Sequence, residues 1–566
     1  MRRRDWLRTA AAGISGKLLA RAQGKPLFEE IAPSSSGISW VHENAMSPAR
    51  YMPEAIGPGC AFLDYDNDGW MDLYFVNSGP APFWTPKQPV RNALYKNNRD
   101  GTFTDVTARA GVAGGIFGMG VAVGDFDNDG WPDMLITGYG RVILYKNNRD
   151  GTFSDITRQA GLDKLPSNWP TSAVWFDYDN DGKLDLFLCN YLLFETGDGK
   201  YATCGDNRLG RNFYCVPRVF NPTSSLLFHN RGDGTFALAS AGTDIEKSKG
   251  KALGVVATDI NNDGLMDLFV ANDTVQNFLF MNRGPAGAGG KWKWEEIALA
   301  AEVGYGENGQ ARSGMGVDAA DFDNDGWQDL FVSNIDQEMF SLYKNNKDET
   351  FRDVAHPNNI AQATRQMSGW GLKFFDYDND GNVDLILANG HPDDMIEQYS
   401  EQIKYQMPML LFHQENGRMR NVSAEAGSVF QKRLSGRGLA VGDFNNDGLI
   451  DVVVATNGGA PLLLKNNSPA GNHWLGVQLT GTSCNRDAVG AKITWSAGGV
   501  TRSRLRNGAG SYLSSHDPRE VLGLGKASGI DILEIRWPAP SKRVERVTKL
   551  PVDRYVRIEE GKGIVG

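Results

Sequence analysis

The stretch DYDNDGWMD at residues 64–72 places four aspartates within nine residues, around one glycine. Carboxylates held this close repel each other unless something neutralises them. The chain of 566 residues nevertheless contains the pattern D-x-[DN]-x-D-G-x-x-D seven times, at intervals of 52 to 82 residues. An internal repeat of this length indicates a repeat architecture rather than several unrelated domains. The seven copies begin at Asp64, Asp125, Asp177, Asp259, Asp321, Asp376 and Asp443.

The surroundings of each copy are similar as well. An apolar run precedes the motif and another follows it, as in GVAVGDFDNDG and DMLITG. Most copies are then followed by LYKNN or a similar segment, a turn, and TFTDVT or TFSDIT. This order is typical of strand, acidic loop, strand, loop, strand, tight turn and strand. Four strands in each of seven units predict an all-β fold, a seven-bladed β-propeller over residues 23–468.

The spacing of the aspartates explains why they are crowded. Side-chain oxygens at motif positions 1, 3, 5 and 9 and a backbone carbonyl at position 7 can surround one hard cation, and glycine at position 6 permits the sharp turn. Ligand sets made only of oxygen favour Ca²⁺ over zinc or copper, so we expect up to seven Ca²⁺ ions. The alternative is a set of solvated acidic turns without metal. The expected ligands are Asp64, Asp66, Asp68, Trp70, Asp72, Asp125, Asp127, Asp129, Trp131, Asp133, Asp177, Asp179, Asp181, Lys183, Asp185, Asp259, Asn261, Asp263, Leu265, Asp267, Asp321, Asp323, Asp325, Trp327, Asp329, Asp376, Asp378, Asp380, Asn382, Asp384, Asp443, Asn445, Asp447, Leu449 and Asp451.

The set of motifs over residues 60–465 resembles the FG-GAP/VCBS propeller family, known from integrin α-subunits and many bacterial secreted proteins. The resemblance implies a Ca²⁺ ion on the loop between the first and second strands of each blade.

The start of the chain offers a strand that the seventh unit lacks. LLLKNN follows the seventh motif, but no TFxDVT segment comes after it. Residues 26–40, PLFEEIAPSSSGISW, resemble that segment and have no acidic loop before them. We therefore expect a strand around residues 28–31 to complete the seventh unit, which removes exposed sheet edges. The alternative is a loose N-terminal arm.

Residues 1–22 resemble a twin-arginine export signal. Arg3 and Arg4 are followed by a weakly apolar stretch that ends in Ala20-Arg21-Ala22, an A-x-A-like cleavage site. We expect an exported protein, either periplasmic, on the cell surface or secreted; the alternative is a basic disordered tail. We expect no transmembrane segment, since the remaining sequence has no run of about 18 apolar residues.

Residues 469–566 lack the acidic motif, and alternating segments such as HWLGVQLTG and GAKITWSAG predict a small antiparallel β domain. Three sequence segments resemble the ASPIC/UnbV domain: NRDAVGAKITW, GAGSYLSSHDPREVLGLG and LEIRWP. That domain follows FG-GAP/VCBS propellers in the cartilage acidic protein-like family and its bacterial relatives. We expect its basic face either to pack on the acidic propeller or to contact an anionic glycan. The basic residues are Arg502, Arg504, Arg506, Arg536, Lys542, Arg543 and Arg546.

Three insertions follow the second strands of the first, third and sixth units: residues 77–93, residues 190–225 and the segment ANGHPDD. Loops between the second and third strands leave a propeller opposite its acidic loops, so the insertions are expected to share one face, where loops commonly carry function. His391 has an equally simple interpretation as a turn histidine bonded to the backbone. The candidate ligand-binding residues are Tyr191, Tyr214, Asn389, His391, Asp393 and Asp394.

The five cysteines match no zinc or redox motif. Cys204 and Cys215 lie in one insertion, and we expect them to form a disulfide in an oxidising compartment. Cys60, Cys189 and Cys484 are expected to be small buried residues.

The sequence favours a binding module over an enzyme. It contains no G-x-S-x-G elbow, Walker A loop or Rossmann fingerprint. The net charge of −10 argues against nucleic acid as a partner. We therefore expect an exported calcium-binding propeller that acts as a binding or adhesion module for a protein or glycan. The alternative is a hydrolase or lyase acting on an extracellular polymer at the face opposite the calcium loops, and the sequence leaves catalysis open.

Overall fold

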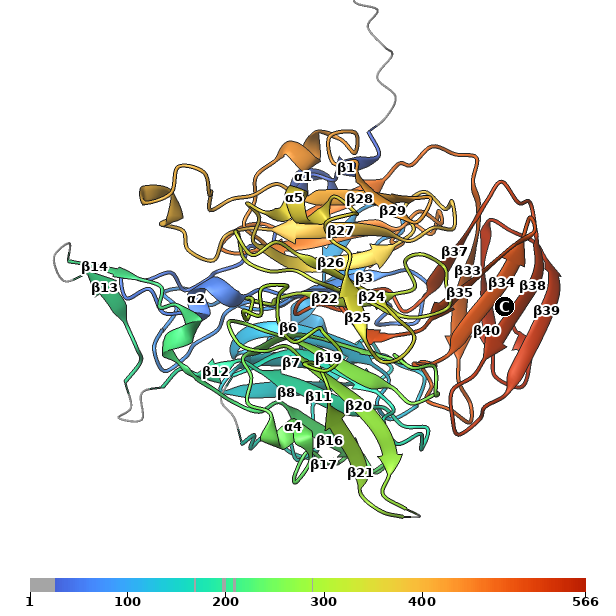
Figure 1. Cartoon of the computed structure of the whole chain (residues 1–566), viewed down its shortest axis with the longest axis horizontal. Helices are drawn as coiled ribbons and strands as arrows, with labels where there is room; N and C mark the ends of the chain where they lie inside the picture. Colours follow the sequence, from blue (N-terminus) through green and yellow to red (C-terminus); the bar gives the residue numbers. More distant parts are fainter. Residues whose placement is uncertain (1–25, 167–168, 196–199, 207–209, 288) are drawn as a thin grey trace, which may run out of the picture.

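The structure is a computed structural model that describes residues 26–166, 169–195, 200–206, 210–287 and 289–566 (Figure 1). The predicted export signal lies outside these residues. The described chain consists mainly of β-strands, which confirms the all-β prediction. None of its helices is both long and apolar enough to cross a membrane.

Within the described residues, seven sheets repeat the same order of four antiparallel strands. The first three are β2 to β5 (Cys60–Leu63, Asp72–Phe75, Ala93–Asn97, Phe103–Asp105), β6 to β9 (Phe117–Gly124, Asp133–Tyr139, Arg141–Asn147, Phe153–Asp155) and β10, β11, β16 and β17 (Pro170–Phe176, Asp185–Asn190, Leu226–Asn230, Phe236–Leu238). The next three are β18 to β21 (Ala252–Thr258, Asp267–Asn272, Phe278–Pro285, Trp292–Glu296), β22 to β25 (Val317–Ala320, Asp329–Val332, Ser341–Asn345, Phe351–Asp353) and β26 to β29 (Gly369–Phe375, Asp384–Asn389, Leu410–Glu415, Arg418–Asn421). The last contains β30 to β32 (Gly436–Gly442, Asp451–Thr456, Leu462–Asn466) and β1 (Phe28–Glu30).

The acidic motif fixes where the second strand of every sheet begins. The position-9 aspartate is the first residue of that strand in all seven described sheets. The first and second strands are buried almost throughout, because each sheet packs its two faces against its neighbours. Strands buried on both faces are expected to read as continuous apolar runs, as these do.

The first strands of the sheets form a ring. They contact each other in the order β2, β6, β10, β18, β22, β26 and β30, and β30 contacts β2 again. The N-terminal strand β1 pairs antiparallel with β32, with Phe28 opposite Asn466. This pairing confirms the predicted closing strand, and the alternative of a loose N-terminal arm is wrong.

Short helices and the insertions connect these strands. In the third sheet's insertion, β12 (Leu192–Leu193) pairs with β15 (Asn221–Pro222), and β13 (Cys204–Asp206) pairs with β14 (Arg211–Phe213). The helices are α1 (Pro33–Ser36), α2 (Pro53–Ile56), α3 (Thr107–Ala110), α4 (Asp244–Lys247), α5 (Ile360–Thr364), η1 (Pro217–Val219), η2 (Ile396–Gln398) and η3 (Ser428–Gln431).

The C-terminal strands form two further sheets around their own apolar core. One contains β37 (Glu520–Gly525), β33 (His473–Thr480), β40 (Arg554–Glu559) and β41 (Gly563–Ile564), and the other contains β35 (Val500–Leu505), β34 (Lys492–Ala497), β38 (Ile530–Arg536) and β39 (Val544–Leu550). The expectation of a purely antiparallel domain needs one correction, because β33 and β40 are parallel. Parallel neighbours require a long crossover, and the strands of the other sheet lie between these two along the chain.

A loop of this C-terminal region runs through the centre of the ring. We call residues 507–517, between β35 and β37, the axial loop. It includes β36 (Gly508–Ala509), which joins the fourth sheet as a fifth strand beside β18. The axial loop pairs with or hydrogen bonds to the first strand of each of the seven described sheets, and its partners in ring order are Ala61, Val121, Ser172, Val256, Val317, Leu372 and Val441.

The tip of the axial loop crosses to the other side of the ring. Tyr512 is fully buried, packs against Trp370 and donates a hydrogen bond to Ile56 O at 3.0 Å. Ile56 lies just before β2, on the side where first strands begin. In Figure 1 the C-terminal strands lie to the right of the seven sheets, and β12 to β14 and α2 lie to the left. Among the described residues, the C-terminal region therefore covers one face and reaches the other through the axial loop.

Replacing Gly59 with alanine tests how tightly this loop is seated. The new Cβ would lie 1.9 Å from Leu513 O and 3.1 Å from Gly120 Cα, so backbone atoms must move. Overpacking of this kind costs about 1–3 kcal/mol of unfolding free energy or more. The matched control is Gly529→Ala, whose Cβ would meet Leu550 O at an ordinary 3.7 Å. Urea unfolding followed by tryptophan fluorescence measures both, and equal midpoints for the two variants would contradict the seating of the loop.

Candidate functional site

The position-1 aspartate organises each acidic loop. In the first loop, Asp68 N donates to Asp64 Oδ1 at 2.9 Å and Gly69 N donates to Asp64 Oδ2 at 2.8 Å. Gly69 has a φ of 84°, a conformation that favours glycine. The backbone therefore wraps around this carboxylate. The same pair of hydrogen bonds occurs in the loops that begin at Asp125, Asp177, Asp259, Asp321 and Asp443.

The position-9 aspartate ties most of the acidic loops to their sheets. Asp72 Oδ2 accepts a hydrogen bond from Tyr65 N at 3.1 Å, and Asp72 Oδ1 accepts one from Asn97 N at 2.7 Å. Asn97 lies on the third strand, so one carboxylate joins the acidic loop, the second strand and the third strand. These carboxylates are all buried; they belong to Asp72, Asp133, Asp185, Asp267, Asp329, Asp384 and Asp451.

Burial and mutual repulsion keep several of these carboxyls from ionising readily. Burial raises the pKa of Asp64 to about 6, and the nearby Asp68 and Asp66 charges add to the shift. Burial followed by repulsion from Asp185 raises the pKa of Asp177 to about 8. In the metal-free protein the Asp177 carboxyl therefore holds its proton at neutral pH, and a bound cation would displace that proton.

The donor set fits a hard divalent cation. Oxygens of positions 1, 3 and 9 converge, as in the groups Asp64, Asp66, Asp72 and Asp125, Asp127, Asp133, whose ligand atoms all lie within 4.8 Å of one another. Buried polar atoms normally have a partner, yet some of these oxygens have none among the described residues. The unpartnered atoms are Oδ1 of Asp66, Asp127, Asp179, Asp323 and Asp376 and Oδ2 of Asp133. The position-5 aspartate is placed differently, since Asp68 turns Oδ1 toward Trp70 N at 3.0 Å.

A side chain of the third strand also reaches most of the loops, and the sequence analysis did not assign it. Lys96 contacts the Asp66 carboxylate and lies 3.1 Å from Asp68 Oδ2. Equivalent lysines contact Asp127, Asp323 and, at 3.7 Å, Asp447. Histidines take this place in the third and sixth sheets. The lysine that recurs in the LYKNN segments is the sequence feature from which this contact could have been predicted.

Two sets of side-chain amides link neighbouring loops around the ring. The amide of the third strand donates to the position-2 carbonyl of the preceding loop, as Asn147 Nδ2 does to Tyr65 O at 2.8 Å. Each of the seven described sheets of the ring has this bond. The donors are Asn97, Asn147, Asn230, Asn282, Asn345, Gln414 and Asn466. The sequence pattern gave this residue no role.

Motif position 4 is asparagine in all seven copies, and the sequence analysis left it unassigned. These asparagines have positive φ values, for example 60° at Asn379. Asn379 Nδ2 donates to Gly448 O of the next loop at 2.9 Å. Asn67, Asn128, Asn262 and Asn446 make the same bond to the glycine of the next loop. The repetition of asparagine within the chain was the signal that could have revealed this link.

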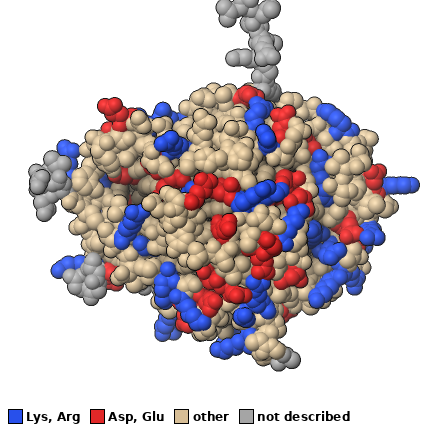
Figure 2. Space-filling view, in the orientation of Figure 1, with Lys and Arg blue, Asp and Glu red and all other residues tan. Residues whose placement is uncertain are grey.

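The C-terminal strands cover the face that carries the acidic loops. Arg519 donates to Asp443 O at 2.7 Å, Arg502 donates to Asp380 O at 3.3 Å, and Arg486 N donates to Asn128 Oδ1 at 2.8 Å. Figure 2 shows acidic side chains gathered in the middle of the view with basic ones beside them. Packing against the propeller, one of the two expected roles of the basic face, is thus observed for part of it.

The remaining basic residues face outward. Arg536, Lys542, Arg543 and Arg546 are exposed. A cavity of about 410 Å³ remains between the two parts of the chain, lined on one side by Asp64, Asp125 and Asp376 and on the other by Arg486, Arg504 and Arg506.

On the opposite side the insertions bring several candidate residues together. Arg50 forms an ion pair with Asp394 at 3.0 Å and lies over the ring of Tyr214. The Tyr214 hydroxyl donates to Glu54 Oε2 at 3.3 Å. Tyr214 and Asp394 therefore belong to one polar cluster.

Other candidates are buried and support the insertions. Tyr191 donates a hydrogen bond to Asp273, and Asn389 Nδ2 donates to Pro408 O at 2.8 Å. His391 is 6% exposed; its Nδ1 accepts from Asp393 N at 3.0 Å, and its Nε2 lies 3.2 Å from Asp336 Oδ1. The interpretation of His391 as a turn histidine is consistent with these contacts.

Arg437 is a buried residue that the sequence analysis missed. Its guanidinium donates to Ala55 O at 2.8 Å and His391 O at 3.2 Å and lies 4.2 Å above the Trp370 ring. Burial lowers its pKa, while carbonyl oxygens and the aromatic face compensate the charge. A single arginine in the apolar segment GRGLAVG gives no sequence signal of this role.

An aromatic cluster joins two of the insertions. Phe83 in the insertion of the first sheet packs edge-on against Phe194 and Tyr201 in the insertion of the third sheet, and Tyr51 and Trp84 lie at the border of this group. We call Tyr51, Phe83, Trp84, Phe194 and Tyr201 the aromatic cluster. Val216 and Val219, in the insertion of the third sheet, are 60% and 59% exposed. The insertion face therefore carries partly exposed apolar surface on a rigid ring.

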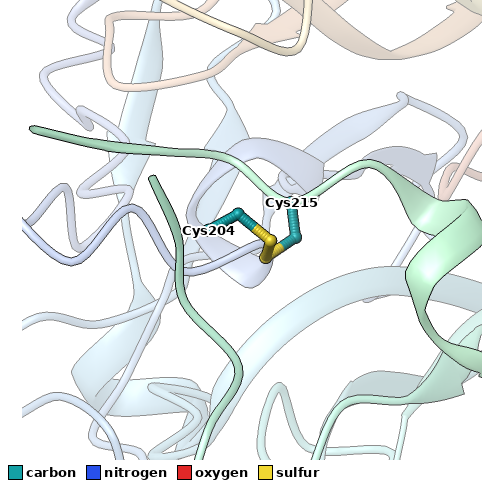
Figure 3. The surroundings of a disulfide bond; sticks show 2 residues. All are labelled: Cys204 and Cys215. Atoms are coloured by element: carbon teal, nitrogen blue, oxygen red, sulfur yellow. A yellow bond between two sulfur atoms is a disulfide. The ribbon is translucent and has the colours of Figure 1, made fainter. Parts of the chain in front are cut away.

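A disulfide joins Cys204 and Cys215 in the insertion of the third sheet, as expected (Figure 3). The two cysteines are 11 positions apart in the sequence, and the bond lies beside the aromatic cluster. Cys60, Cys189 and Cys484 are free and buried, which also agrees with the prediction.

Comparisons with known proteins agree with this architecture. The FG-GAP-like repeat model matches residues 64–136, 125–188, 213–270, 259–332 and 321–387, and the ASPIC and UnbV model matches residues 481–565. Human cartilage acidic protein 1 is 24% identical over 501 residues, covering 85% of this chain and 60% of the relative. The Xenopus tropicalis protein of the same name is 26% identical over 350 residues, covering 59% of this chain and 48% of the relative. The chain thus spans about half to three fifths of these curated relatives.

Among solved structures, a lectin from Agrocybe aegerita that recognises non-reducing terminal N-acetylglucosamine is 16% identical. The match covers 64% of this chain and 79% of the lectin at a TM-score of 0.37, which is too low to inform the function. An outer coat vertex of COPII on membranes matches at 9% identity and a TM-score of 0.39, covering 87% of this chain and 97% of that one.

Substitutions at Asn379 separate two effects of this residue on stability, its hydrogen bond to the next loop and its positive φ. Asn379→Gly keeps the positive φ but removes the hydrogen bond to Gly448 O, which costs about 1 kcal/mol of unfolding free energy. Asn379→Ala removes the bond and adds about 1–2 kcal/mol of backbone strain. We expect stability to fall in the order wild type, Asn379→Gly, Asn379→Ala in chemical denaturation. Asn308→Ala at an exposed loop position is the control, and equal stability of the two Asn379 variants would contradict the strain argument.

Proposed function

This chain belongs to the FG-GAP-like repeat family and ends in an ASPIC and UnbV domain, and on this basis we propose that it is an exported, calcium-binding β-propeller that binds a protein or glycan. The family supports a binding or adhesion role in general terms. Calcium, export and the class of partner are the finer parts of the proposal, and each rests on a separate observation.

Calcium is proposed from the ligand chemistry of the loops. Positions 1, 3 and 9 supply converging carboxylate oxygens, and positions 5 and 7 follow in the same turn. Several of the buried oxygens have no hydrogen-bond partner among the described residues, which suits a bound cation of small radius and high charge. Bound Ca²⁺ would neutralise the repulsion within each loop, and the surrounding N–H groups would hold the carboxylates in place.

Export is proposed from the start of the sequence and from the disulfide. Cys204 and Cys215 form a disulfide in an insertion at the protein surface, and such bonds persist in oxidising compartments. The twin-arginine segment at residues 1–22 is consistent with this. The proposed location is the periplasm, the cell surface or the medium.

The observation that carries the binding proposal is the difference between the two faces. The C-terminal strands cover the acidic-loop face, whereas the insertion face presents the aromatic cluster and the exposed Val216 and Val219. Partly exposed aromatic rings next to apolar side chains are typical of surfaces that bind proteins or the apolar faces of sugars. We therefore place the partner on the insertion face.

Binding is favoured over hydrolysis or lysis of a polymer. Each ring nitrogen of His391 already has a neighbour, Asp393 N or Asp336 Oδ1, so this histidine is not a free general base. Tyr191 and Asn389 are buried as well. Asp393 and Asp394 stay partly exposed at the edge of the insertion face and remain candidate contacts for the partner.

Removal of Ca²⁺ is expected to lower the melting temperature by well over 5 °C. Ligand binding to the folded state alone stabilises it by about 2.7 kcal/mol per site when the free ligand is at 100 times Kd. Calorimetry with excess Ca²⁺ and after chelation measures the difference, and metal analysis confirms removal. Asp125→Asn should lower the bound calcium by about one equivalent. An unchanged melting curve in protein shown to be free of metal would refute a structural role of calcium.

Changes in the aromatic cluster are expected to abolish partner binding without unfolding the chain. Trp84→Ala with Tyr201→Ala removes two partly exposed rings, and Val219→Asp places a charge on the same surface without opening the cluster. A glycan array and a panel of immobilised extracellular proteins are the probes. Trp292→Ala is the matched control, because Trp292 packs on Tyr178 away from the insertions. If the variants bind like wild type and charge reversal at Arg543 and Arg546 abolishes binding, the site lies on the C-terminal region instead.

A further inference from the structure

The third strand places one side chain at most of the acidic loops, and its register determines which one. The position-9 carboxylate accepts a hydrogen bond from a backbone N–H of the third strand, for example from Asn97 N in the first sheet. In the third and sixth sheets the donors are Asn230 N and Gln414 N, at 2.7 and 2.8 Å. The residue just before this donor is the one that reaches the loop. Lys96, His229 and His413 are therefore structurally equivalent.

These equivalent positions differ in their ability to bind a metal. A protonated lysine has no lone pair, so it can only add positive charge beside the loop, whereas a neutral imidazole has a nitrogen that can coordinate a metal ion. Lysine occupies the position in four sheets, methionine in the fourth sheet, and histidine in the third and sixth. The residues, in chain order, are Lys96, Lys146, His229, Met281, Lys344, His413 and Lys465.

The sixth loop has a converging set of two carboxylates and one imidazole. His413 Nδ1 lies 3.0 Å from Asp384 Oδ1, and the ligand atoms of Asp378, Asp384 and His413 all lie within 4.8 Å of one another. Asp376 is only 2% exposed, and its Oδ1 has no hydrogen-bond partner among the described residues. In this loop the position-5 N–H, from Asp380, donates to Asp378 instead of to Asp376. The sixth loop thus contains a buried carboxylate oxygen without a partner among the described residues, in addition to the two carboxylates that converge with the imidazole.

In the third loop the buried oxygen without a partner is Asp179 Oδ1 instead, because both oxygens of Asp177 accept backbone N–H groups. His229 Nδ1 lies 3.2 Å from Asp179 Oδ2 and 3.3 Å from Asp185 Oδ1, and it forms no hydrogen bond within the described residues. The ligand atoms of Asp179, Asp181 and His229 lie within 4.8 Å of one another. In both loops the position-2 tyrosine packs edge-on against the imidazole, Tyr178 at 6.1 Å and Tyr377 at 5.7 Å between ring centroids. The tyrosines hold the imidazoles toward the carboxylates.

We propose that the third and sixth loops bind a divalent transition metal ion of the zinc class through His229 and His413, while the all-oxygen loops bind Ca²⁺. This deepens the proposed function, because it rests on the acidic loops being metal sites. An imidazole nitrogen beside carboxylates suits Zn²⁺ and its neighbours, whereas Ca²⁺ takes oxygen ligands. Two ligands bound at about 2 Å to one ion lie at most about 4 Å apart, so the atoms now within 4.8 Å need only small shifts.

The test uses the full chain stripped of metal and then loaded with Zn²⁺ in a large excess of Ca²⁺. After dialysis, elemental analysis is expected to find about two equivalents of Zn²⁺ per chain. Co²⁺ in place of Zn²⁺ reports the nitrogen ligand through its visible absorption spectrum. His229→Lys and His413→Lys, which copy the other loops, should each lose about one equivalent. His356→Lys is the matched control, because His356 is exposed and distant in sequence from any acidic loop.

A second pair of variants, His229→Gln and His413→Gln, replaces the imidazole nitrogen by an amide oxygen. These variants keep the test valid if the lysine variants do not fold. We expect them to keep Ca²⁺ binding while Zn²⁺ affinity at the altered loop falls by at least about tenfold. Displacement of all Zn²⁺ by Ca²⁺ in wild type, or two equivalents of Zn²⁺ retained after both histidines are replaced, would overturn this inference and leave the calcium proposal intact. Histidine-dependent Zn²⁺ binding in a chain that takes up no Ca²⁺ would support it and refute the calcium proposal.

Discussion

Repulsion among the carboxylates of the acidic loops is the constraint on which the rest of the structure depends. Backbone N–H groups around the position-1 aspartate reduce this repulsion, and in all the loops but the fourth a lysine or histidine of the third strand adds positive charge or a hydrogen-bond donor. The position-9 aspartate shares this environment while starting the second strand. Because amides of the neighbouring sheets bond to loop carbonyls, the shape of one loop also determines how the next sheet is placed.

The two faces of the ring therefore differ in regularity and in what covers them. The acidic-loop face repeats with little variation and is covered by the C-terminal region, whose arginines bond to loop carbonyls. The insertion face has no such repetition, and its aromatic and polar clusters come from different sheets. Arg437, Trp370 and Tyr512 lie between the two and connect the axial loop to the insertions.

Much of the fold could be predicted because its signals are local. The seven motifs, the apolar runs beside them and the unpaired segment at residues 26–40 each specify a strand or turn within a few residues. The axial loop could not be predicted, because GAGSYLSS reads as an ordinary polar loop and its partners lie in seven distant strands. The parallel pairing of β33 with β40 and the charge of the buried Arg437 likewise depend on tertiary contacts. The candidate ligands followed from spacing, whereas the burial of His391 did not.

The axial loop also constrains when the protein can fold. During synthesis the first six sheets leave the ribosome in order, but the seventh needs β1, which precedes all of them, and the inner strands need residues 507–517, which follow all seven sheets. Until then the inner edges of the first strands lack their hydrogen-bond partners. Completion of the ring therefore waits until residues 507–517 have been synthesised, and up to that point a nascent chain must keep apolar strand edges from associating with other chains.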